Sequence, residues 1–152
     1  MPHKKAKTIS YYEMSYEDIP QVAYLERQAF SQPWSESGIT TYLDSGTTIF
    51  VVAKHRETVV GYGAVMRVLD ESDLISLVVD ENYRRLGIAR EILDISYDIA
   101  RENGVKKIHL EVRKGNEAAR RLYESEGFKE TGKRPGFYER PKEDAILYTK
   151  EL

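Results

Sequence analysis

The stretch "NYRRLGIAREIL", Asn82–Leu93, decides the fold of this chain. It places two arginines, a lone glycine and a small residue directly before an amphipathic helical pattern. The free N–H groups of a first helical turn favour an anion by about 0.3–1 kcal/mol at an exposed site. Arg84, Arg85 and Arg90 would add charge-assisted hydrogen bonds, which are about twice as strong as neutral ones. The stretch therefore predicts a site for an anion of the size of a pyrophosphate.

Two well-known phosphate-binding patterns are absent around this stretch. The chain has neither a Walker loop nor G-x-G-x-x-G at this position. What remains is R-R-x-G-x-A, in which Gly87 lets backbone approach a ligand and Ala89 keeps the first helical turn slim. The alternative is that Gly87 only marks a turn and that the arginines lie in solvent. A short motif is a weak signal until its context agrees.

Hydrophobic periodicity on both sides of the stretch predicts one mixed α/β domain with an α+β mixed sheet. The predicted strands are residues 8–15, 48–54, 58–68, 73–80, 106–112, 128–133 and 144–151. The predicted helices begin at Ser15, at Ser35, after Gly87 and at Asn116. A long loop with Pro135, Gly136 and Pro141 is expected between the last two strands. The predicted order is β-α-α-β-β-β-α-β-α-β-β.

Composition excludes several classes of function. The 152 residues have a net charge of −2, which argues against nucleic-acid or membrane-surface binding driven by bulk charge. The absence of cysteine excludes thiol nucleophiles and disulfides, and three scattered histidines (His3, His55 and His109) show no metal-ligand spacing. No apolar run approaches the roughly 18 residues of a membrane span. We expect a cytoplasmic protein without a metal, and its many charges and lack of cysteine are typical of thermophiles.

Two longer stretches together resemble a known family. "DLISLVVDENYRRLGIAREIL" followed by "LEVRKGNEAARRLYESEGF" resembles the GNAT superfamily of acetyl-CoA-dependent N-acetyltransferases. The first stretch matches the R/Q-x-x-G-x-G/A motif at Arg84, Gly87 and Ala89, and the second is similar to the RimI-type, N-terminal-amine branch. The resemblance runs from about Thr8 to Leu152. It implies the GNAT fold over residues 8–152 after a flexible tail of residues 1–7, and it implies coenzyme A pyrophosphate as the anion.

The resemblance also implies the residues that bind the cofactor. In the family, backbone groups of the strand before the motif receive the pantetheine arm and the thioester carbonyl, and the motif wraps the pyrophosphate. Asn116 matches the family residue whose amide side chain hydrogen-bonds the pantetheine arm. Its alternative role is to cap a helix, and it could do both. The implied cofactor-binding residues are Leu77, Val78, Val79, Arg84, Arg85, Leu86, Gly87, Ile88, Ala89, Arg90, Asn116 and Tyr123.

Two catalytic roles follow from the same resemblance. Glu111 falls where the branch places a general base, which would take a proton from the attacking ammonium through water. Its alternative is an ordinary surface salt bridge, since Arg113 shares its face of the strand. Tyr123 corresponds to the general acid for the departing thiolate, and core packing is the alternative. His109 also shares the face of Glu111, where it could relay protons or be a satisfied, partly buried histidine.

The acceptor is expected to be the α-amine of a protein. An α-amine has a pKa near 8 and is about one-tenth neutral at pH 7, against roughly one part in a few thousand for lysine. By resemblance, Phe30, Pro33 and Trp34 of "FSQPWSE" would form an apolar wall for the acceptor's first side chain. Tyr138 would bond the peptide backbone, although Phe137 stands where many relatives carry a second tyrosine.

The predicted reaction is direct transfer from acetyl-CoA to protein or peptide N-termini in a ternary complex, because no cysteine exists to carry an acyl group. Ribosomal proteins or other nascent chains are the expected partners. Two alternatives stay open on the sequence alone. One is the same fold acetylating lysine side chains or a small-molecule amine. The other is an acetyl-CoA-binding module without catalysis.

Overall fold

One seven-stranded sheet carries the fold in this computed structural model, which describes residues 8–152. The strand order is β1-β2-β3-β4-β5-β7-β6. The strands are β1 (Ile9–Glu13), β2 (Thr48–His55), β3 (Thr58–Val68), β4 (Glu71–Val79), β5 (Lys107–Arg113), β6 (Lys129–Tyr138) and β7 (Glu143–Glu151). The helices are α1 (Ile19–Ala29), α2 (Glu36–Ser45), α3 (Ile88–Glu102) and α4 (Glu117–Ser125), with 3-10 turns η1 (Tyr16–Asp18) and η2 (Glu81–Tyr83). The predicted element order is confirmed, while the predicted tail of residues 1–7 lies outside the described residues.

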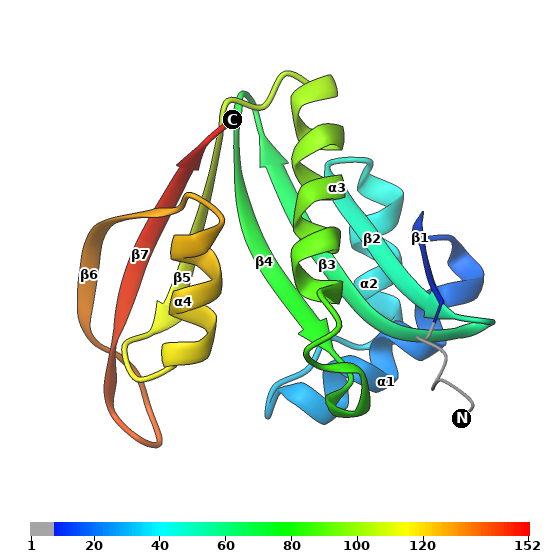
Figure 1. The fold of residues 1–152 in the computed structure, drawn as a ribbon, viewed down its shortest axis with the longest axis horizontal. Helices are drawn as coiled ribbons and strands as arrows, with labels where there is room; N and C mark the ends of the chain where they lie inside the picture. The colour runs from blue at the N-terminus through cyan, green and yellow to red at the C-terminus, as the bar shows by residue number, and fades with distance from the viewer. Residues whose placement is uncertain (1–7) are drawn as a thin grey trace, which may run out of the picture.

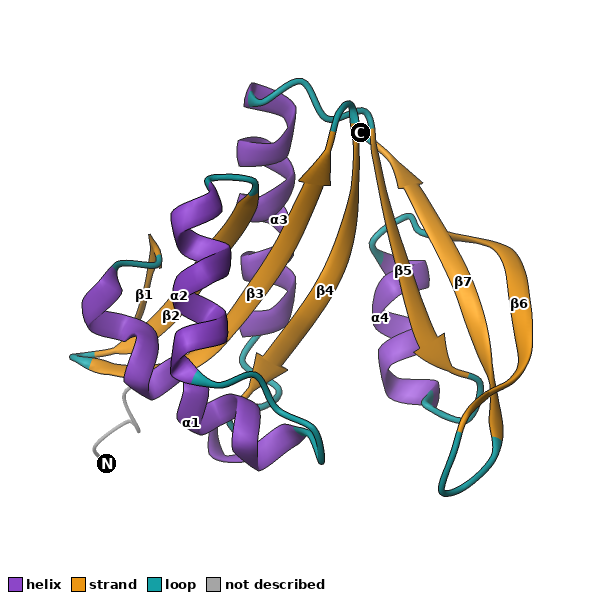
Figure 2. Ribbon diagram, turned by 180° about the vertical axis from the view of Figure 1, so that it is seen from behind, coloured by secondary structure: helices purple, strands orange, loops and turns teal. Residues whose placement is uncertain are grey.

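The helices cover both faces of the sheet. Helices α3 and α4 lie on one face, and α1 and α2 cover the other face over β2 and β3 (Figures 1 and 2). Each face has its own apolar core. Ile88, Ile92 and Leu93 of α3 are buried in the first core, and Val22 of α1 with Ile39 of α2 in the second. No helix within residues 8–152 is long and apolar enough to cross a membrane.

Strands β4 and β5 separate soon after they meet. They pair in parallel over only three residue pairs, from Glu71–Lys107 to Asp73–His109. Beyond this point the sheet opens into a V, with β4 on one arm and β5 on the other (Figure 1). A β-bulge accompanies the separation, since Ala64 pairs with Ser76 and Val65 with Leu74, which leaves Ile75 as the extra residue of β4. Bulges bend and twist a strand, and the bend turns β4 away from β5.

The N-terminus of α3 lies at the open end of the split. Gly87 adopts a φ of 76°, which L side chains rarely take, and it lets the chain turn from η2 into the helix. Its neighbour two residues earlier, Arg85, also has a positive φ of 64°. Helix α3 packs close to β3 because Gly63 carries no side chain; a Cβ there would lie 2.7 Å from Cγ2 of Ile92.

Side-chain caps mark the two predicted helix starts at Ser15 and Ser35. The Ser15 N–H donates to Oδ2 of Asp18 at 2.9 Å ahead of α1, and Oδ1 of Asp18 pairs with Nζ of Lys54 at 2.7 Å. Oγ of Ser35 accepts from the N–H of Gly38 at 3.1 Å and caps α2. Both predicted helix starts are therefore capped as the sequence indicated.

The last hairpin corrects one expectation. The predicted strand ended at residue 133 and a long loop followed, whereas β6 continues to Tyr138 and only residues 139–142 connect it to β7. The pairing of β6 with β7 shifts register between Arg134 and Tyr138, around Pro135 and Gly136. Because β6 is an edge strand, a proline without an N–H is tolerated in it, especially beside a bulge.

Candidate active site

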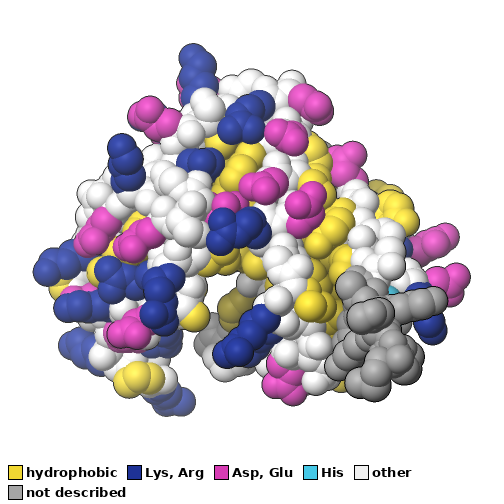
Figure 3. All heavy atoms as spheres, viewed as in Figure 1, with side chains coloured by type: hydrophobic (Ala, Val, Ile, Leu, Met, Phe, Trp, Pro, Cys, Tyr) yellow, Lys and Arg dark blue, Asp and Glu magenta, His cyan; other side chains and the backbone are white. Residues whose placement is uncertain are grey.

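A cavity of about 530 Å³ occupies the α3 side of the split and is called the α3 cavity below. It is bounded by the second half of β4, the turn into α3, the first half of α4 and the end of α1. In the space-filling view a hollow opens between the two halves of the molecule, with Lys and Arg side chains at its rim (Figure 3). Nine of the predicted cofactor-binding residues line the α3 cavity: Leu77, Val78, Val79, Arg84, Arg85, Gly87, Ile88, Ala89 and Arg90.

The rim of the α3 cavity has the properties of an anion site. The first internal bond of α3 runs from the N–H of Glu91 to the Gly87 carbonyl, so the preceding first-turn N–H groups have no acceptor within the helix. Within residues 8–152, the exposed guanidinium groups of Arg84 and Arg85 make no ion pair or hydrogen bond. Free guanidinium groups beside open helix amides suit a diphosphate.

Arg90 is engaged differently from the other two arginines. Its Nη1 lies 3.1 Å from Oε2 of Glu126 and its Nη2 lies 3.1 Å from Oγ of Ser125. The side chain therefore links α3 to the C-terminal end of α4 while it also lines the cavity. This contact joins the two arms of the split on the face that carries α3.

Three predicted cofactor residues do not line the α3 cavity. Leu86 is half exposed on the turn before α3. Oδ1 of Asn116 accepts from the N–H of Ala119 at 3.2 Å, so it caps α4, which was its alternative role. Tyr123 packs the edge of its ring against Phe128, with centroids 5.6 Å apart, and burial raises its pKa to about 12.

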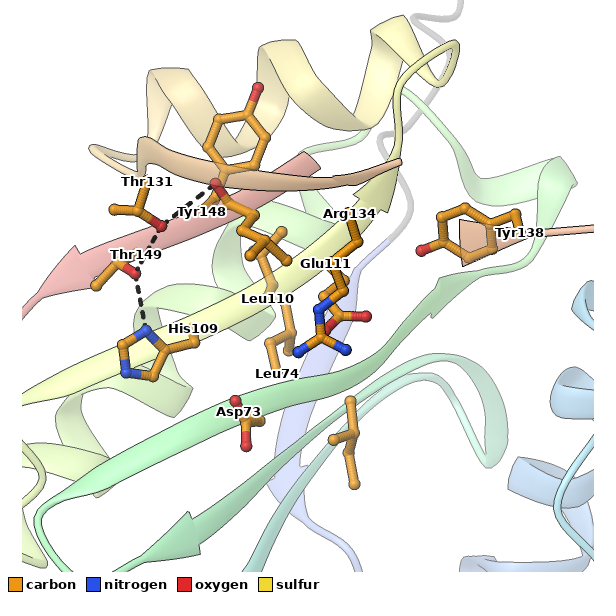
Figure 4. Close-up of a pocket in the computed structure, with 12 residues that line it drawn as sticks. Asp73, Leu74, His109, Leu110, Glu111, Thr131, Arg134, Tyr138, Tyr148 and Thr149 are labelled. Carbon is orange, nitrogen blue, oxygen red and sulfur yellow. Dashed lines mark hydrogen bonds and ion pairs between the residues drawn. The ribbon is translucent and has the colours of Figure 1, made fainter. Parts of the chain in front are cut away.

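A second cavity of about 620 Å³ lies beside β5, β6 and β7 and is called the Glu111 cavity below. Since Leu110 and Val112 of β5 face the core on the α3 side, Glu111 and His109 point to the opposite face of the sheet. Glu111 and Tyr138, two predicted site residues, both line this cavity, and Figure 4 shows them projecting into it from different strands.

Glu111 is held by an arginine that sequence reasoning missed. Oε1 of Glu111 lies 3.2 Å from Nη2 of Arg134 on β6 (Figure 4). The expected alternative partner, Arg113, instead pairs with Glu143 at 3.4 Å and lies over the Tyr138 ring at 4.4 Å. Burial, and next the charge of Glu111, raise the pKa of Tyr138, although Arg113 lowers it. Because Arg134 already pairs with Glu111, a cationic amine that approaches this carboxylate meets the positive charge of the arginine.

His109 has partners for both ring nitrogens. Nδ1 lies 2.8 Å from Oγ1 of Thr149, which continues to Thr131, and Nε2 lies 2.8 Å from Oε1 of Glu71 (Figure 4). The histidine lines the Glu111 cavity, and its partners lie at the first residue of β4 and on β7. This geometry matches the satisfied histidine that was one of its two expected roles.

A third, smaller cavity of about 250 Å³ lies between the end of α1, the α1–α2 loop and β4. Phe30 and Trp34, two residues of the predicted apolar wall, line it together with Glu26 and Ile75, whereas Pro33 does not. The Trp34 ring is fixed against Tyr42, with centroids 5.1 Å apart. We call this space the loop cavity.

The loop cavity borders each of the other two cavities. Ile75 lines both the Glu111 cavity and the loop cavity, and Phe30 lines both the loop cavity and the α3 cavity. The α3 cavity and the Glu111 cavity, on opposite faces of the sheet, are thus linked only through the loop cavity among these three. Sequence reasoning missed Ile75, because a bulge depends on the register between two strands. It also missed Glu26, although a carboxylate beside the apolar stripe of α1 was a readable signal.

The fold thus has a cavity with an anion-binding rim on one face of a split sheet and a cavity with a carboxylate on the other, an arrangement that suits a group-transfer enzyme with a phosphate-bearing donor. Residues 19–128 match the acetyltransferase (GNAT) family, and the chain belongs to this family. It is therefore an acetyl-CoA-dependent N-acetyltransferase, as the sequence predicted. Within residues 8–152 no group of His, Asp or Glu side chains is arranged to hold a metal ion.

Several relatives share most of their length with this chain. The [ribosomal protein bS18]-alanine N-acetyltransferase of Escherichia coli K12 is 34% identical over 132 residues, which is 86% of this chain and 88% of the relative. The enzyme of the same name from Salmonella typhimurium is 34% identical over 139 residues, 88% of this chain and 91% of its own length. The crystal structure of the E. coli ribosomal-protein-S18-alanine N-acetyltransferase superposes with a TM-score of 0.86 at 29% identity, covering 95% of this chain and 94% of that one.

Proposed function

We propose that this enzyme transfers the acetyl group of acetyl-CoA to the α-amine of a protein N-terminus by direct attack in a ternary complex. The observation that carries the proposal is the split between β4 and β5, with the α3 cavity on one face of the sheet and the Glu111 cavity on the other. The names of the relatives, which are alanine N-acetyltransferases of a ribosomal protein, support an N-terminal acceptor. Ribosomal proteins or nascent chains in the cytoplasm are the proposed partners.

The donor would bind along the α3 cavity. Arg84, Arg85 and the first-turn amides of α3 would hold the pyrophosphate, with Gly87 and Ala89 leaving room for it. Within residues 8–152, the backbone of Leu77 to Val79 on β4 has no strand partner on the β5 side, and it would bond the pantetheine arm and the thioester carbonyl. Leu86, Asn116 and Tyr123 do not line this cavity; Leu86 precedes α3, Asn116 caps α4, and Tyr123 lies in the second half of α4.

The acceptor would enter from the opposite face. Phe30 and Trp34, with Pro33 beside them, would form the wall for its first side chain, and Tyr138 would bond its backbone. Glu111 would take the proton of the attacking ammonium, which must displace Arg134 or bind beside it. An α-ammonium, with a pKa near 8, gives up its proton more readily than a lysine at about 10.4.

Tyr123 would assist the departing thiolate by a hydrogen bond more than by full proton transfer. A free thiol has a pKa of about 8.5, so a proton moving from a phenol at about 12 goes uphill by about 3.5 units, roughly 5 kcal/mol. A hydrogen bond from the neutral phenol to the sulfur stabilises the same developing charge without that transfer.

The decisive experiment compares two sets of short peptides with acetyl-CoA. One set has free N-termini and no lysine, and the other has blocked N-termini and contains lysine. We expect transfer to the first set only, and a fall in kcat of about 100-fold or more for Glu111→Gln with an unchanged Kd for acetyl-CoA. Glu130→Gln, which removes the same charge from a β6 residue paired with Arg120 at 3.9 Å, is the matched control. Equal turnover of the blocked lysine peptides would contradict the proposed acceptor.

A further inference from the structure

Glu26 on α1 is a buried carboxyl that the proposed reaction does not use. Only 4% of the residue is exposed, beside the buried Val22 and Leu25 of the same helix. Burial raises its pKa, against the opposing effect of hydrogen bonds from Trp34 and Ser76. A carboxyl in such a place destabilises the chain unless hydrogen-bond donors reach it.

The donors that reach Glu26 are distant. Oγ of Ser76 lies 3.3 Å from Oε2, and the N–H of Trp34 lies 3.5 Å from Oε1, both at the long limit of a hydrogen bond. Ser76 is shared with the buried hydroxyl of Tyr62 at 2.9 Å. Within the described part of the chain, no lysine, arginine or histidine pairs with Glu26. Since a carboxylate offers about four acceptor positions, most of its capacity is unused by the protein.

Glu26 lines the loop cavity, and it is the only charged side chain that does so among the described residues. Phe30, Trp34 and Ile75 contribute the apolar part of the wall, and Ser31 and Gln32 contribute the remainder. Because Ile75 also lines the Glu111 cavity, a peptide with its amine at Glu111 would have its first side chain next to the loop cavity. This step rests on the function proposed above.

We propose that Glu26 is a specificity-determining residue that selects the first side chain of the acceptor. It favours a neutral side chain that carries a hydrogen-bond donor, a hydroxyl or an amide, over an apolar side chain of the same shape. It disfavours a carboxylate, whose charge would lie against that of Glu26 in the same small cavity.

The size of the selection follows from hydrogen-bond energetics. A donor that enters the loop cavity satisfies the carboxyl, whereas an apolar isostere excludes water from it and offers nothing in return. Hydrogen bonds to charged groups correspond to a preference of about tenfold or more in kcat/KM. Two isosteric pairs of first residues, which differ in side-chain length, test this preference: threonine with valine, and glutamine with methionine.

The test uses peptides that differ only in the first residue and compete pairwise for the full-length enzyme, with products resolved by mass spectrometry. A competition ratio does not depend on how much of a variant is folded. For the wild type we expect one or both donor peptides to be preferred about tenfold over their isosteres, and a glutamate peptide to be accepted least. Glu26→Met should bring both ratios close to one. Glu26→Gln should keep a preference for donors and accept the glutamate peptide.

Glu17→Gln, which removes an exposed carboxylate from the η1 turn, is the matched control and should leave every ratio unchanged. Ratios that are equal in the wild type and Glu26→Met would overturn this inference alone, because transfer to free N-termini would still be measured. No transfer to any of the five peptides would overturn the proposed function as well.

Discussion

Tyr123 shows at the scale of one residue how burial constrains a catalytic role. Its ring is packed against Phe128, and burial raises its pKa to about 12. The phenol therefore keeps its proton throughout the range of an ordinary assay. We predict that Tyr123→Phe lowers kcat about tenfold, the loss of one hydrogen bond to a charged sulfur, with little change in the Kd for acetyl-CoA.

The pH dependence separates hydrogen bonding from deprotonation of Tyr123. Since a group with a pKa of about 12 is protonated below pH 11, kcat profiles of the wild type and Tyr123→Phe from pH 7 to about 10 should have the same shape. An alkaline decline in the wild type that vanishes in the variant would show that Tyr123 titrates in this range.

Arg134 and the acceptor are expected to compete for Glu111. The Arg134 side chain is 57% exposed, and its pair with Glu111 is of the kind worth about 0.2–1 kcal/mol. We predict that Arg134→Met lowers the KM for an acceptor peptide about two- to fivefold, and that the difference shrinks when salt rises from about 0.02 to 0.3 M. Arg134→Lys keeps the charge and serves as the control. A higher KM in Arg134→Met would mean that the arginine contacts the peptide instead.

Glu26 should make the stability of the folded chain depend on pH. Its folded-state pKa is raised, chiefly by burial, above the ordinary value of about 4.3 that the unfolded chain has. The folded chain therefore favours the neutral carboxyl, and stability falls as the pH rises from about 4.3 through the folded-state pKa. We predict that the Tm of Glu26→Gln minus that of the wild type increases over this interval. A difference that shrinks with rising pH would show a lowered pKa.

The N-terminus of α3 makes a separate prediction at the scale of one element. Gly87 has a φ of 76°, and a Cβ there would meet nothing within 4 Å, so alanine brings backbone strain without a clash. We expect Gly87→Ala to lose about 1–2 kcal/mol of folding free energy and to bind acetyl-CoA more weakly. Gly104, at the opposite end of α3, has a φ of 78° and equally open space. Gly104→Ala should lose similar stability but bind acetyl-CoA like the wild type, as calorimetry can measure.

Elements were predictable where a local pattern decides them. The alternation of Ile108, Leu110 and Val112 and the helical spacing of Ile88 and Ile92 place β5 and α3 as observed. Periodicity within one segment carries this information because each element buries one face. The predicted end of β6 was wrong because proline and glycine near residue 135 usually indicate a loop. An edge strand with a bulge accommodates both residues.

The site was predictable only in part, because its contacts join distant segments. Motif residues such as Arg84 and Gly87 lie within one turn and were found together. Glu111 on β5 and Arg134 on β6 come together because both strands pair with β7. The bulge at Ile75 depends on the register of β4 against β3. No short stretch of sequence contains these relations. Glu26 had a local signal, a charge beside the buried stripe of α1, but only the fold shows which cavity it faces.

At the scale of the whole molecule, few contacts close the split. Three residue pairs join β4 to β5, and on the α3 face Arg90 connects α3 to Glu126 and Ser125. The ring of Tyr97 on α3 adds a contact with Phe128, with centroids 6.4 Å apart. Acetyl-CoA in the α3 cavity would contact β4, α3 and α4 together. It would thereby add contacts between the two arms to those that the free enzyme makes.

Ligand binding should therefore stabilise the molecule as a unit. A ligand that binds only the folded chain adds about 2.7 kcal/mol when present at about 100 times its Kd. We predict a corresponding rise in the urea midpoint with acetyl-CoA, with α4 and α3 unfolding in a single transition. S-acetyl-pantetheine, which carries the thioester without the diphosphate, should produce almost no shift at the same concentration, because Arg84, Arg85 and the α3 amides would have nothing to bind. Equal shifts from the two compounds would place the binding free energy in the pantetheine arm and remove the diphosphate from the centre of donor recognition.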